Sequence, residues 1–493
     1  MSAAGETTTY FAAGLARHAA LRPTDPAIVT AEAIIDFATL QRAVLAEADA
    51  LRNAGVRHGS RLALAMRDRP AHVAALFALQ RLGAAAFLVA PDEPPMVREA
   101  LLEQSGAVAA LGDRADDGGW SVPFLPIGAG GDADADLPPP PDPDDVCMLR
   151  RSSGTTGGLP RLTPTTHRFE LTQFEMLWGM VARGPGDRYL SLVSTVFDFG
   201  RVTVQRALYA GAAVILPPAL RTVGDLTAAA GRLRATWTIA TPTHLRHLLG
   251  QPGPWPLLPG VGLLTTSAIL TDAERAQVME EISPELYVLY ATNEVGLLAV
   301  ARPDDLRNVP ETVGRPMSAI RLEVVDAKGQ PVPAGSVGEI RASHPTYPRP
   351  EQPGAQGSSS RFFGEWFYPG DLGVLDAQGY LFLKGRTDDV INVGGRKIYP
   401  SEIVECLTAH PAVAEAAAIG ILERRLGAVP VAAVVLRGPA PAPEAALLGH
   451  CRDRLGRDRS PGRILTFEAL PKTAADKVDR AALRRQIVAR LSG

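Results

Sequence analysis

Residues 152–158 read Ser-Ser-Gly-Thr-Thr-Gly-Gly, and no other run of the chain places three glycines among so many hydroxyl side chains. Glycine lets the backbone adopt conformations closed to other residues and exposes its N–H groups, while serine and threonine add short hydrogen-bond donors. A concave loop of this kind suits a polyphosphate, although a flexible surface loop can have the same composition. The residues that would contact phosphate are Ser152, Ser153, Gly154, Thr155, Thr156 and Gly157.

This run is not a P-loop of the nucleotide triphosphatase type, because that loop requires Gly-Lys followed by Ser or Thr at the start of a helix. Instead, the segment from Ser153 to His167 resembles the phosphate loop of the acyl-adenylate-forming superfamily, whose usual form is Ser-Gly-Thr-Thr-Gly-x-Pro-Lys-Gly. Arg161 stands where the lysine is expected, and the loop is one residue longer. Its spacing is similar to that of stand-alone aryl-acid adenylating enzymes.

Size and composition narrow the class of protein. The chain has 493 residues, 46% of them hydrophobic, which is enough for two or more domains with buried cores. Its 50 basic and 53 acidic residues give a net charge of −3, so we expect no nucleic-acid partner. Cys147, Cys406 and Cys451 lie far apart and indicate neither a disulfide framework nor a metal cluster. With no secretion signal and no apolar run of ~18 residues, we expect a cytoplasmic protein without a membrane partner.

Strand-like and helix-like segments alternate in the first part of the chain. Residues 61–66 and 84–89 are short apolar runs typical of buried strands, and residues 71–82 between them have helical spacing. This order predicts a parallel sheet with helices on its faces. A strand at residues 146–149 would place the phosphate loop at its carboxyl end, where open α/β sheets bind ligands. The Gly-, Asp- and Pro-rich segment 128–145 is expected to be an exposed linker.

The last quarter of the chain changes in composition and resembles a small α+β domain. Residues 320–325 and 338–342 before it alternate like antiparallel strands. Together with the resemblance, these patterns predict an α/β fold with a large N-terminal domain of mixed parallel sheets and a distorted barrel-like part, followed by a small mobile C-terminal α+β domain. The predicted boundary separates residues 1–385, which would bind ATP and the acid, from residues 386–493, which would carry the catalytic lysine.

The turn from Tyr290 to Glu294 resembles the superfamily's Tyr-Gly-x-Thr-Glu motif. The resemblance implies that Glu294 holds a Mg²⁺ ion bridging the phosphates and that Tyr290 lies against the adenine. It also places Ala291, Thr292 and Asn293 at the nucleotide. Ala291 and Asn293 depart from the motif, and Asn293 puts an amide where a hydroxyl is expected near the α-phosphate. In isolation, the pentapeptide would be a solvated helix cap.

Two motifs follow in the second half of the chain. Asp371 lies in Tyr-Pro-Gly-Asp-Leu-Gly, similar to the superfamily's Thr-Gly-Asp-Leu-Gly, which implies that its carboxylate accepts both ribose hydroxyls. Arg386 is the implied second contact with the ribose or the phosphates, and Asp388 is the implied hinge between the domains.

Lys477 lies in Leu-Pro-Lys-Thr-Ala-Ala-Asp-Lys-Val, which resembles a signature around the catalytic lysine of the superfamily. Its ammonium would bridge the attacking carboxylate and the α-phosphate, which suits a point charge on a flexible stem. Asp476 replaces the usual glycine. Residues 389–403, with Gly394 and Gly395, look most like acyl- and aryl-CoA ligases, in which this segment lines a thiol channel once the small domain has rotated.

The resemblance also locates the pocket for the acid, around His167, Asp198, Phe199 and Ser267. The spacing from Asp198 to Gly211 is similar to that of amino-acid adenylating domains, in which an aspartate pairs with the substrate's amino group. An uncompensated carboxylate facing an apolar pocket would be costly, which favours a cationic group on the substrate. The alternative is an aspartate satisfied by backbone amides or by solvent.

These motifs predict the activation of a small carboxylic acid, aromatic or amino-bearing, by ATP and Mg²⁺. An acyl-adenylate would form with release of pyrophosphate, and the acyl group would pass to a pantetheine thiol. That thiol could belong to CoA, which residues 389–403 favour, or to a separate acyl or peptidyl carrier protein, which the aryl-acid-like loop favours.

Two alternatives use the same motifs. One is an amino-acid adenylating enzyme that loads a separate carrier protein. The other is a nucleotide-binding regulatory protein that has lost catalysis, an interpretation supported by the departures at Arg161, Asn293 and Asp476. The regulatory alternative is opposed by four residues that nucleotide binding alone would not require together: Glu294, Asp371, Arg386 and Lys477.

Overall fold

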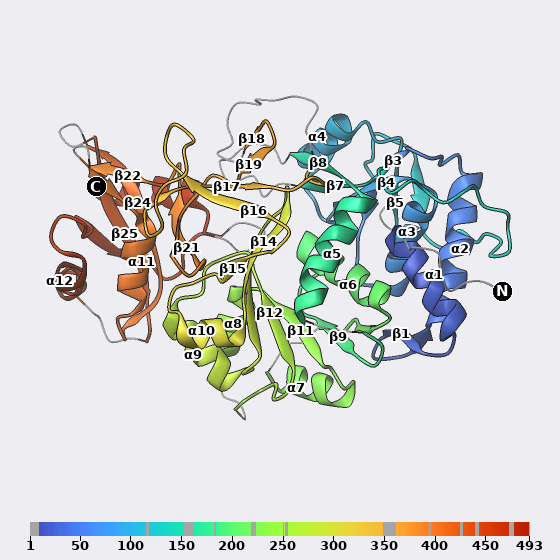
Figure 1. The fold of residues 1–493 in the computed structure, drawn as a ribbon, viewed down its shortest axis with the longest axis horizontal. Helices are drawn as coiled ribbons and strands as arrows, with labels where there is room; N and C mark the ends of the chain where they lie inside the picture. The colour runs from blue at the N-terminus through green and yellow to red at the C-terminus, as the bar shows by residue number, and fades with distance from the viewer. Residues whose placement is uncertain are drawn as a thin grey trace.

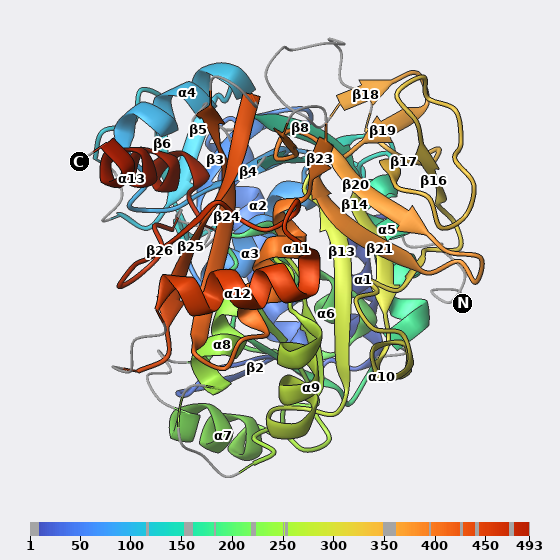
Figure 2. The ribbon, with the colours of Figure 1, turned by 90° about the vertical axis from the view of Figure 1, so that its left-hand side faces the viewer.

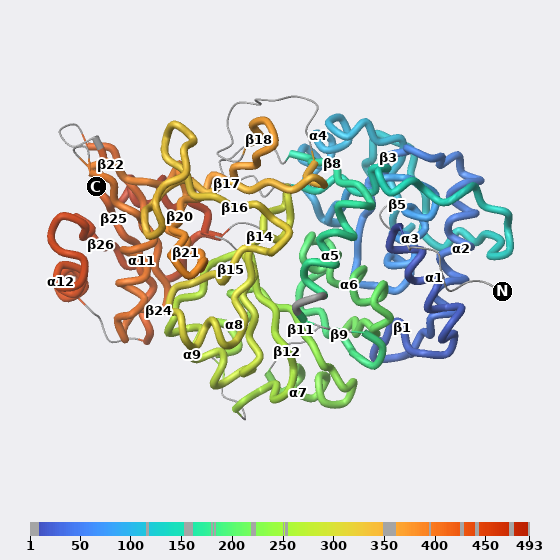
Figure 3. The backbone as a smooth tube through the Cα atoms, viewed as in Figure 1, coloured from blue at the N-terminus to red at the C-terminus, as the bar shows by residue number. Residues whose placement is uncertain are grey.

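The computed structural model describes most of the chain. The described residues are 9–114, 118–151, 161–181, 184–217, 223–249, 251, 255–348, 361–393, 396–423, 427–438, 443–472 and 478–492. Figures 1 and 3 show the N-terminal helices and the C-terminal segment at opposite ends of an elongated molecule. No helix in these ranges combines the length and the apolar character that crossing a membrane requires.

The largest sheet has nine strands in the order β15-β14-β13-β12-β11-β9-β10-β1-β2. Its central strands, from β10 through β9, β11 and β12 to β13, are all parallel, so their carboxyl ends meet at one edge. The strands are β1 (Pro26–Val29), β2 (Ile34–Asp36), β9 (Arg188–Ser191), β10 (Ala213–Ile215), β11 (Trp237–Ala240), β12 (Gly262–Thr265), β13 (Leu286–Thr292), β14 (Gly296–Ala301) and β15 (Arg315–Pro316).

A second sheet of six strands runs in the order β6-β5-β3-β4-β7-β8. Its members are β3 (Arg61–Ala65), β4 (Ala85–Val89), β5 (Ala109–Gly112), β6 (Phe124–Pro126), β7 (Val146–Arg151) and β8 (Leu162–Thr166). All pairs are parallel except β7 with β8. The parallel sheet expected from the sequence is therefore confirmed. Residues 162–166 of the Ser153–His167 segment that resembles the phosphate loop form strand β8, which lies at the sheet edge, where a proline such as Pro164 is tolerated in a strand.

Helices cover these sheets and connect their strands (Figure 1). They are α1 (Phe11–Leu21), α2 (Phe37–Asn53), α3 (Pro70–Arg81), α4 (Pro95–Ser105), α5 (His167–Val181), α6 (Asp198–Ala210), α7 (Val223–Arg232), α8 (Pro242–Leu249), α9 (Asp272–Glu281) and α10 (Pro303–Asn308). The spacing-based prediction of a helix at residues 71–82 is confirmed by α3. Helix α9 was not predicted, although Thr271 and Glu274 form a capping box at its start.

The third sheet is antiparallel and is formed by residues between 321 and 386, before the C-terminal segment. Strands β18 (Arg361–Phe363), β19 (Trp366–Tyr368), β17 (Gly338–Ser343), β20 (Asp371–Leu375) and β21 (Leu381–Arg386) lie in this order, and β16 (Arg321–Val325) pairs with β17. The pairing of these described strands leaves the sheet open. The part expected to be barrel-like is therefore an unclosed sheet.

The C-terminal segment forms a fourth sheet, covered by helices of its own (Figure 2). It contains β22 (Ile391–Val393), β23 (Arg396–Ile398), β24 (Val413–Glu423), β25 (Gly427–Leu436) and β26 (Arg463–Thr466), with α11 (Pro400–Thr408), α12 (Glu444–Leu455) and α13 (Arg480–Ser492). Two clusters of buried apolar side chains fill it, and all their members lie within residues 391–487. The boundary between residues 385 and 386 stays a prediction.

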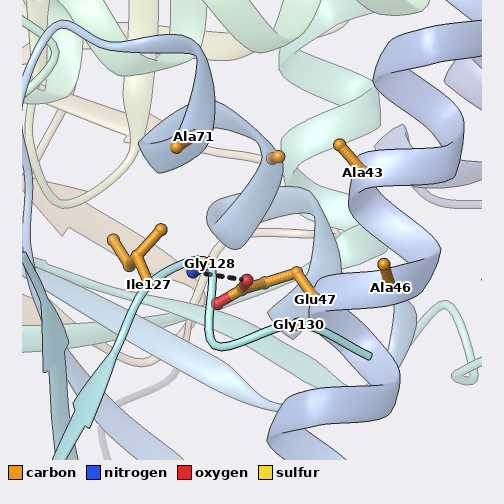
Figure 4. Close-up of a pocket in the computed structure, with 8 residues that line it drawn as sticks. Ala43, Ala46, Glu47, Ala71, Ile127, Gly128 and Gly130 are labelled. Carbon is orange, nitrogen blue, oxygen red and sulfur yellow. Dashed lines mark hydrogen bonds between the residues drawn. The ribbon is translucent and has the colours of Figure 1, made fainter. Parts of the chain in front are cut away.

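The segment predicted to be an exposed linker packs along α2. Gly128 N donates a hydrogen bond of 2.9 Å to Glu47 Oε2, Asp132 N donates one of 3.0 Å to Asp49 Oδ2, and Arg52 donates to the carbonyl of Asp136. Figure 4 shows the Glu47 side chain hydrogen-bonded to the backbone of Gly128. Both residues line a pocket of about 190 Å³. The carboxylates of Glu47 and Asp49 thus hold this segment against α2 through hydrogen bonds to its backbone.

Glu47 and Asp49 provide a stability test. Glu47 is 6% exposed, and its carboxylate accepts a hydrogen bond from the neutral Gly128 N–H; burial raises its pKa despite this bond. Because the folded state then holds the proton more tightly than the unfolded state, the contribution of Glu47 to stability falls as the pH rises through its pKa. Glu47→Gln should therefore raise the free energy of unfolding at pH 7 by roughly 1 kcal/mol, as measured by urea denaturation.

Asp49→Asn is the matched control on the same helix. Asp49 pairs with Arg52 at 2.5 Å and accepts from Asp132, so losing its charge should lower stability at pH 7. A lower stability of Glu47→Gln at pH 7 would contradict the assignment of Glu47 as an uncompensated buried carboxyl.

Candidate active site

Several of the predicted site segments follow the carboxyl ends of strands in the two parallel sheets. Strand β7 ends at Arg151, directly before the glycine-rich run, and β13 ends at Thr292 within the predicted metal-binding turn. Ser267 follows β12, and Asp198 follows β9 and begins α6. Ligands of open α/β sheets bind at such edges, so the topology brings together segments that are far apart in the chain.

The phosphate-loop residues Ser152, Ser153, Gly154, Thr155, Thr156 and Gly157 lie outside the described residues. The residues that flank the loop are described, and Arg151 pairs with Leu162 across the β7–β8 ladder. The Arg151 side chain makes two hydrogen bonds to Glu93, at 2.6 and 2.8 Å. Both ends of the loop are therefore anchored by the sheet.

Asn293 connects the turn that is predicted to bind the metal to β7, the strand directly before the phosphate-loop sequence. Its Nδ2 donates a hydrogen bond of 2.7 Å to the carbonyl oxygen of Arg151. Thr292 stabilises the same turn, because its hydroxyl oxygen accepts from Val295 N at 3.2 Å, while Ala291 is exposed. The side-chain amide of Asn293, which replaces the hydroxyl of the superfamily motif, thus has a hydrogen-bond partner in Arg151, the residue directly before the phosphate-loop sequence.

Tyr290, Asp371 and Arg386 form a hydrogen-bonded group. The Tyr290 hydroxyl donates to Asp371 Oδ2 at 2.6 Å, and Arg386 Nη1 lies 3.1 Å from Asp371 Oδ1. Asp371 and Arg386 face each other as a cross-strand pair of β20 and β21, so the strand register fixes their contact. Burial raises the pKa of Asp371, against the effects of Arg386 and Tyr290, and burial raises the pKa of Tyr290 well above its usual range.

Glu294 is partly exposed on the same turn, and its negative charge contributes to the raised pKa of Tyr290. In the described part of the chain, no group of three or more His, Cys, Asp or Glu side chains could hold a metal by itself. A single carboxylate fits Mg²⁺ bound through phosphate oxygens, because this ion usually takes one or two protein carboxylates and keeps several waters.

The residues predicted to contact the acid lie in different environments. His167 is 1% exposed, its ring is edge-on to Tyr10 at 5.6 Å, and burial lowers its pKa to about 4. His167 is therefore a buried side chain packed against Tyr10, and its contact with the acid stays a prediction. Ser267 is exposed at the sheet edge with φ +85°, a conformation that is strained for serine and is enriched at functional sites. Phe199 packs partly against the core.

Asp198 already has cationic partners. Arg201 Nη2 lies 2.5 Å from its Oδ1, and Arg150 Nη1 lies 3.5 Å from its Oδ2. The premise that this carboxylate is uncompensated is therefore incorrect. The Asp198 side chain is 22% exposed, and its pairing with a substrate amino group stays a prediction. Sequence analysis missed these arginines, although Arg150 and Arg151 end an otherwise apolar strand, where a charge requires a buried partner.

The hinge region is described in part. Asp388 lies 3.5 Å from Arg386, and the neighbouring Asp389 pairs with Arg480 of α13 at 2.7 Å. Gly394, Gly395 and Lys477 lie outside the described residues. The segment containing Lys477 is flanked by Lys472 and Val478, which pair as an isolated antiparallel bridge.

Comparisons with known proteins agree with this architecture. The AMP-binding enzyme family model matches residues 15–347, and the AMP-binding enzyme C-terminal domain model matches residues 402–477. Indoleacetate–CoA ligase of Aromatoleum aromaticum is 28% identical over 96% of this chain and 97% of its own length. Sulfoacetate–CoA ligase of Cupriavidus necator is 32% identical over 80% of this chain and 76% of its own length.

A solved structure has the same fold. The crystal structure of ATP-bound MatB from Rhodopseudomonas palustris superposes with a TM-score of 0.89 at 22% identity, covering 97% of this chain and 99% of MatB. The family model covers well over half of the chain, and its C-terminal companion follows in the expected order. The chain therefore belongs to the AMP-binding enzyme family, the acyl-adenylate-forming superfamily that its sequence resembles, and is an AMP-forming carboxylate ligase.

Proposed function

We propose that the protein joins a small carboxylic acid to CoA through an acyl-adenylate. In the first step, a carboxylate oxygen of the acid attacks the α-phosphorus of ATP, and pyrophosphate leaves. In the second, the CoA thiol, having lost its proton, attacks the acyl carbon, and AMP leaves. The observation that carries this proposal is the direct connection of three distant motifs by the Asn293–Arg151 and Tyr290–Asp371–Arg386 hydrogen bonds.

These contacts suit a nucleotide rather than a simple phosphate. The Asp371 carboxylate has acceptor capacity beyond its bonds to Tyr290 and Arg386, because a carboxylate offers about four lone-pair sites. Its position fits acceptance of ribose hydroxyls, with Arg386 beside it to contact the ribose or the phosphates. Ser152, Ser153, Gly154, Thr155, Thr156 and Gly157 would hold the phosphates, and Glu294 would hold Mg²⁺, which supplies positive charge to the phosphate oxygens when bound.

Lys477 is the proposed catalytic cation. Two anions must approach each other in the first step, so a mobile ammonium near both would stabilise the charge that develops in the transition state. The bridge between Lys472 and Val478 fixes the chain on both sides of this segment. Gly394 and Gly395 would line the path of the thiol, and Asp388 would be the pivot of the small domain.

CoA is the proposed acceptor rather than a carrier protein. Both relatives described above are named CoA ligases, and the match to indoleacetate–CoA ligase extends over nearly the whole of both chains. The name of that relative also supports an aromatic acid. A requirement for an amino group on the acid is less well supported, because Asp198 is already paired with Arg201 and Arg150.

The Lys477→Ala variant tests the mechanism. With a panel of aromatic and aliphatic acids, each with and without CoA, the wild-type protein should release pyrophosphate in an acid-dependent manner. Lys477→Ala should slow this step by about 10²–10³-fold, the usual effect of removing one group that stabilises a transition state. Binding of ATP, measured by calorimetry, should change little.

Lys472→Ala is the matched control, since Lys472 lies five positions earlier and pairs with Glu415 at 2.5 Å. It should retain nearly full activity. Normal adenylate formation by Lys477→Ala would refute the catalytic role. ATP binding by the wild type without pyrophosphate release for any acid would instead favour the regulatory alternative.

Substitution of Asp198 tests the amino-group hypothesis. Because arginines already neutralise this carboxylate, Asp198→Ala should lower activity for all acids while leaving the ranking of amino-bearing and amino-free acids unchanged. The measurement is kcat/KM for matched pairs such as anthranilate and benzoate. A selective loss of the amino-bearing members would show that Asp198 binds a substrate ammonium.

A further inference from the structure

Four charged side chains form a closed ring between β7, α5 and α6. Arg150 of β7 donates to both carboxylate oxygens of Glu170 on α5, at 2.9 and 3.0 Å. Arg201 of α6 lies 3.4 Å from Glu170 Oε1 and 2.5 Å from Asp198 Oδ1. Asp198 Oδ2 closes the ring, 3.5 Å from Arg150 Nη1. Each carboxylate therefore lies between two guanidinium groups.

Most of this ring is removed from water. The side chains of Arg150, Glu170 and Arg201 are 2%, 0% and 0% exposed, whereas Asp198 is 22% exposed. Burial disfavours the charged form of Glu170, but Arg150 and Arg201 outweigh this effect and hold its pKa far below the usual range. Because a buried charge that loses its partner is strongly destabilised, the four side chains are constrained to move together.

Neighbouring hydrogen bonds hold the ring in place. Thr165 of β8 donates to Glu170 Oε1 at 3.0 Å, and Arg201 Nη1 donates to Gln205 Oε1 at 2.5 Å, one turn further along α6. The ring is thus attached to both strands of the β7–β8 hairpin and to the body of α6. The phosphate loop connects the two strands of that same hairpin.

The ring spans the two parts of the proposed active site. Arg150 directly precedes Arg151, whose carbonyl accepts from Asn293 and after which the phosphate loop begins. Asp198 is the first residue of α6, the helix predicted to line the acid pocket. A displacement of the first turn of α6 must therefore be accompanied by a displacement of β7, or the ion pairs break.

We propose that the ring of Arg150, Glu170, Arg201 and Asp198 is a positioning device that fixes the β7–β8 hairpin, whose strands flank the phosphate-loop sequence, relative to the first turn of α6 at the predicted acid pocket. The assignment of the phosphate loop and of the acid pocket rests on the proposed function. The ring sets the separation between the acid carboxylate and the α-phosphorus, and nucleophilic attack requires these groups to be held close and aligned. All four side chains are positioning residues, and Asp198 is their solvent-facing member.

Calorimetry with ATP and Mg²⁺, without any acid, tests this proposal. Arg201 lies on α6, away from the predicted nucleotide contacts, yet Arg201→Met should weaken ATP binding about ten-fold, within the range for residues that couple two sites. Arg201→Lys keeps the charge and should restore part of the affinity. Asp198→Asn alters the exposed member of the ring with little change of shape, and it should weaken ATP binding to a smaller extent.

Arg246→Met is the matched control. Arg246 of α8 forms an ion pair with Glu274 at 2.6 Å, and its described hydrogen bonds go to Glu274 and Ile269 rather than to the ring, so its removal should leave ATP affinity unchanged. Circular dichroism at the assay temperature verifies folding. Equal losses of affinity in Arg201→Met and Arg246→Met, or unchanged affinity in a folded Arg201→Met, would overturn the proposal. If Arg201→Met does not fold, unchanged affinity in Asp198→Asn overturns it.

The test also separates the two proposals. Absence of acid-dependent pyrophosphate release by the wild type contradicts the proposed function, whereas the comparison of ATP affinities among the variants does not depend on turnover. Where an acid is turned over, a coupling role further predicts that Arg201→Met raises the KM for the acid as well as the KM for ATP.

Discussion

The hydrogen bond from Tyr290 to Asp371 is the contact on which the arrangement of the nucleotide site depends. It connects β13 of the nine-stranded sheet to β20 of the antiparallel sheet, and the register of β20 with β21 then places Arg386 against the same carboxylate. Because β21 ends at Arg386, two residues before Asp388, this contact also fixes the start of the predicted hinge. The Asp371 carboxylate thereby holds the two sheets together and fixes the end of β21, from which the chain continues to the small domain.

Electrostatics explains why so many cations gather near the proposed site. Joining a carboxylate to a polyphosphate brings like charges together, and a low-dielectric environment strengthens both the repulsion and any compensating attraction. The chain supplies guanidinium groups at the ends of β7 and β21 and holds them in place with Glu93, Glu170 and Asp371. Positioned in this way, these charges need little reorganisation when a substrate binds.

Much of the fold and the location of the site could be predicted, because they depend on local pattern and on motif order. Short apolar runs at residues 61–66 and 84–89 indicated the parallel strands, and the helical spacing of residues 71–82 predicted α3. The resemblance predicted that Asp371 and Arg386 both contact the nucleotide, and in the structure their side chains are in contact with each other. The contact of Asp198 with Arg150 could not be predicted in this way, because Arg150 lies on another element and its distance from Asp198 is set by tertiary packing alone. The contact with Arg201, three residues further along α6, is local and was overlooked. Burial of His167 under Tyr10 was missed for the same reason.

The central claim is that the acid is activated on the α-phosphorus of ATP, and transfer of an oxygen isotope tests it most directly. An acid labelled with ¹⁸O in its carboxyl group, incubated with ATP, Mg²⁺, CoA and the enzyme, should yield AMP containing one ¹⁸O atom, detected by mass spectrometry. This result follows because the attacking carboxylate oxygen stays on phosphorus when the thiol displaces AMP. Unlabelled AMP, or label recovered in inorganic phosphate together with ADP, would contradict it.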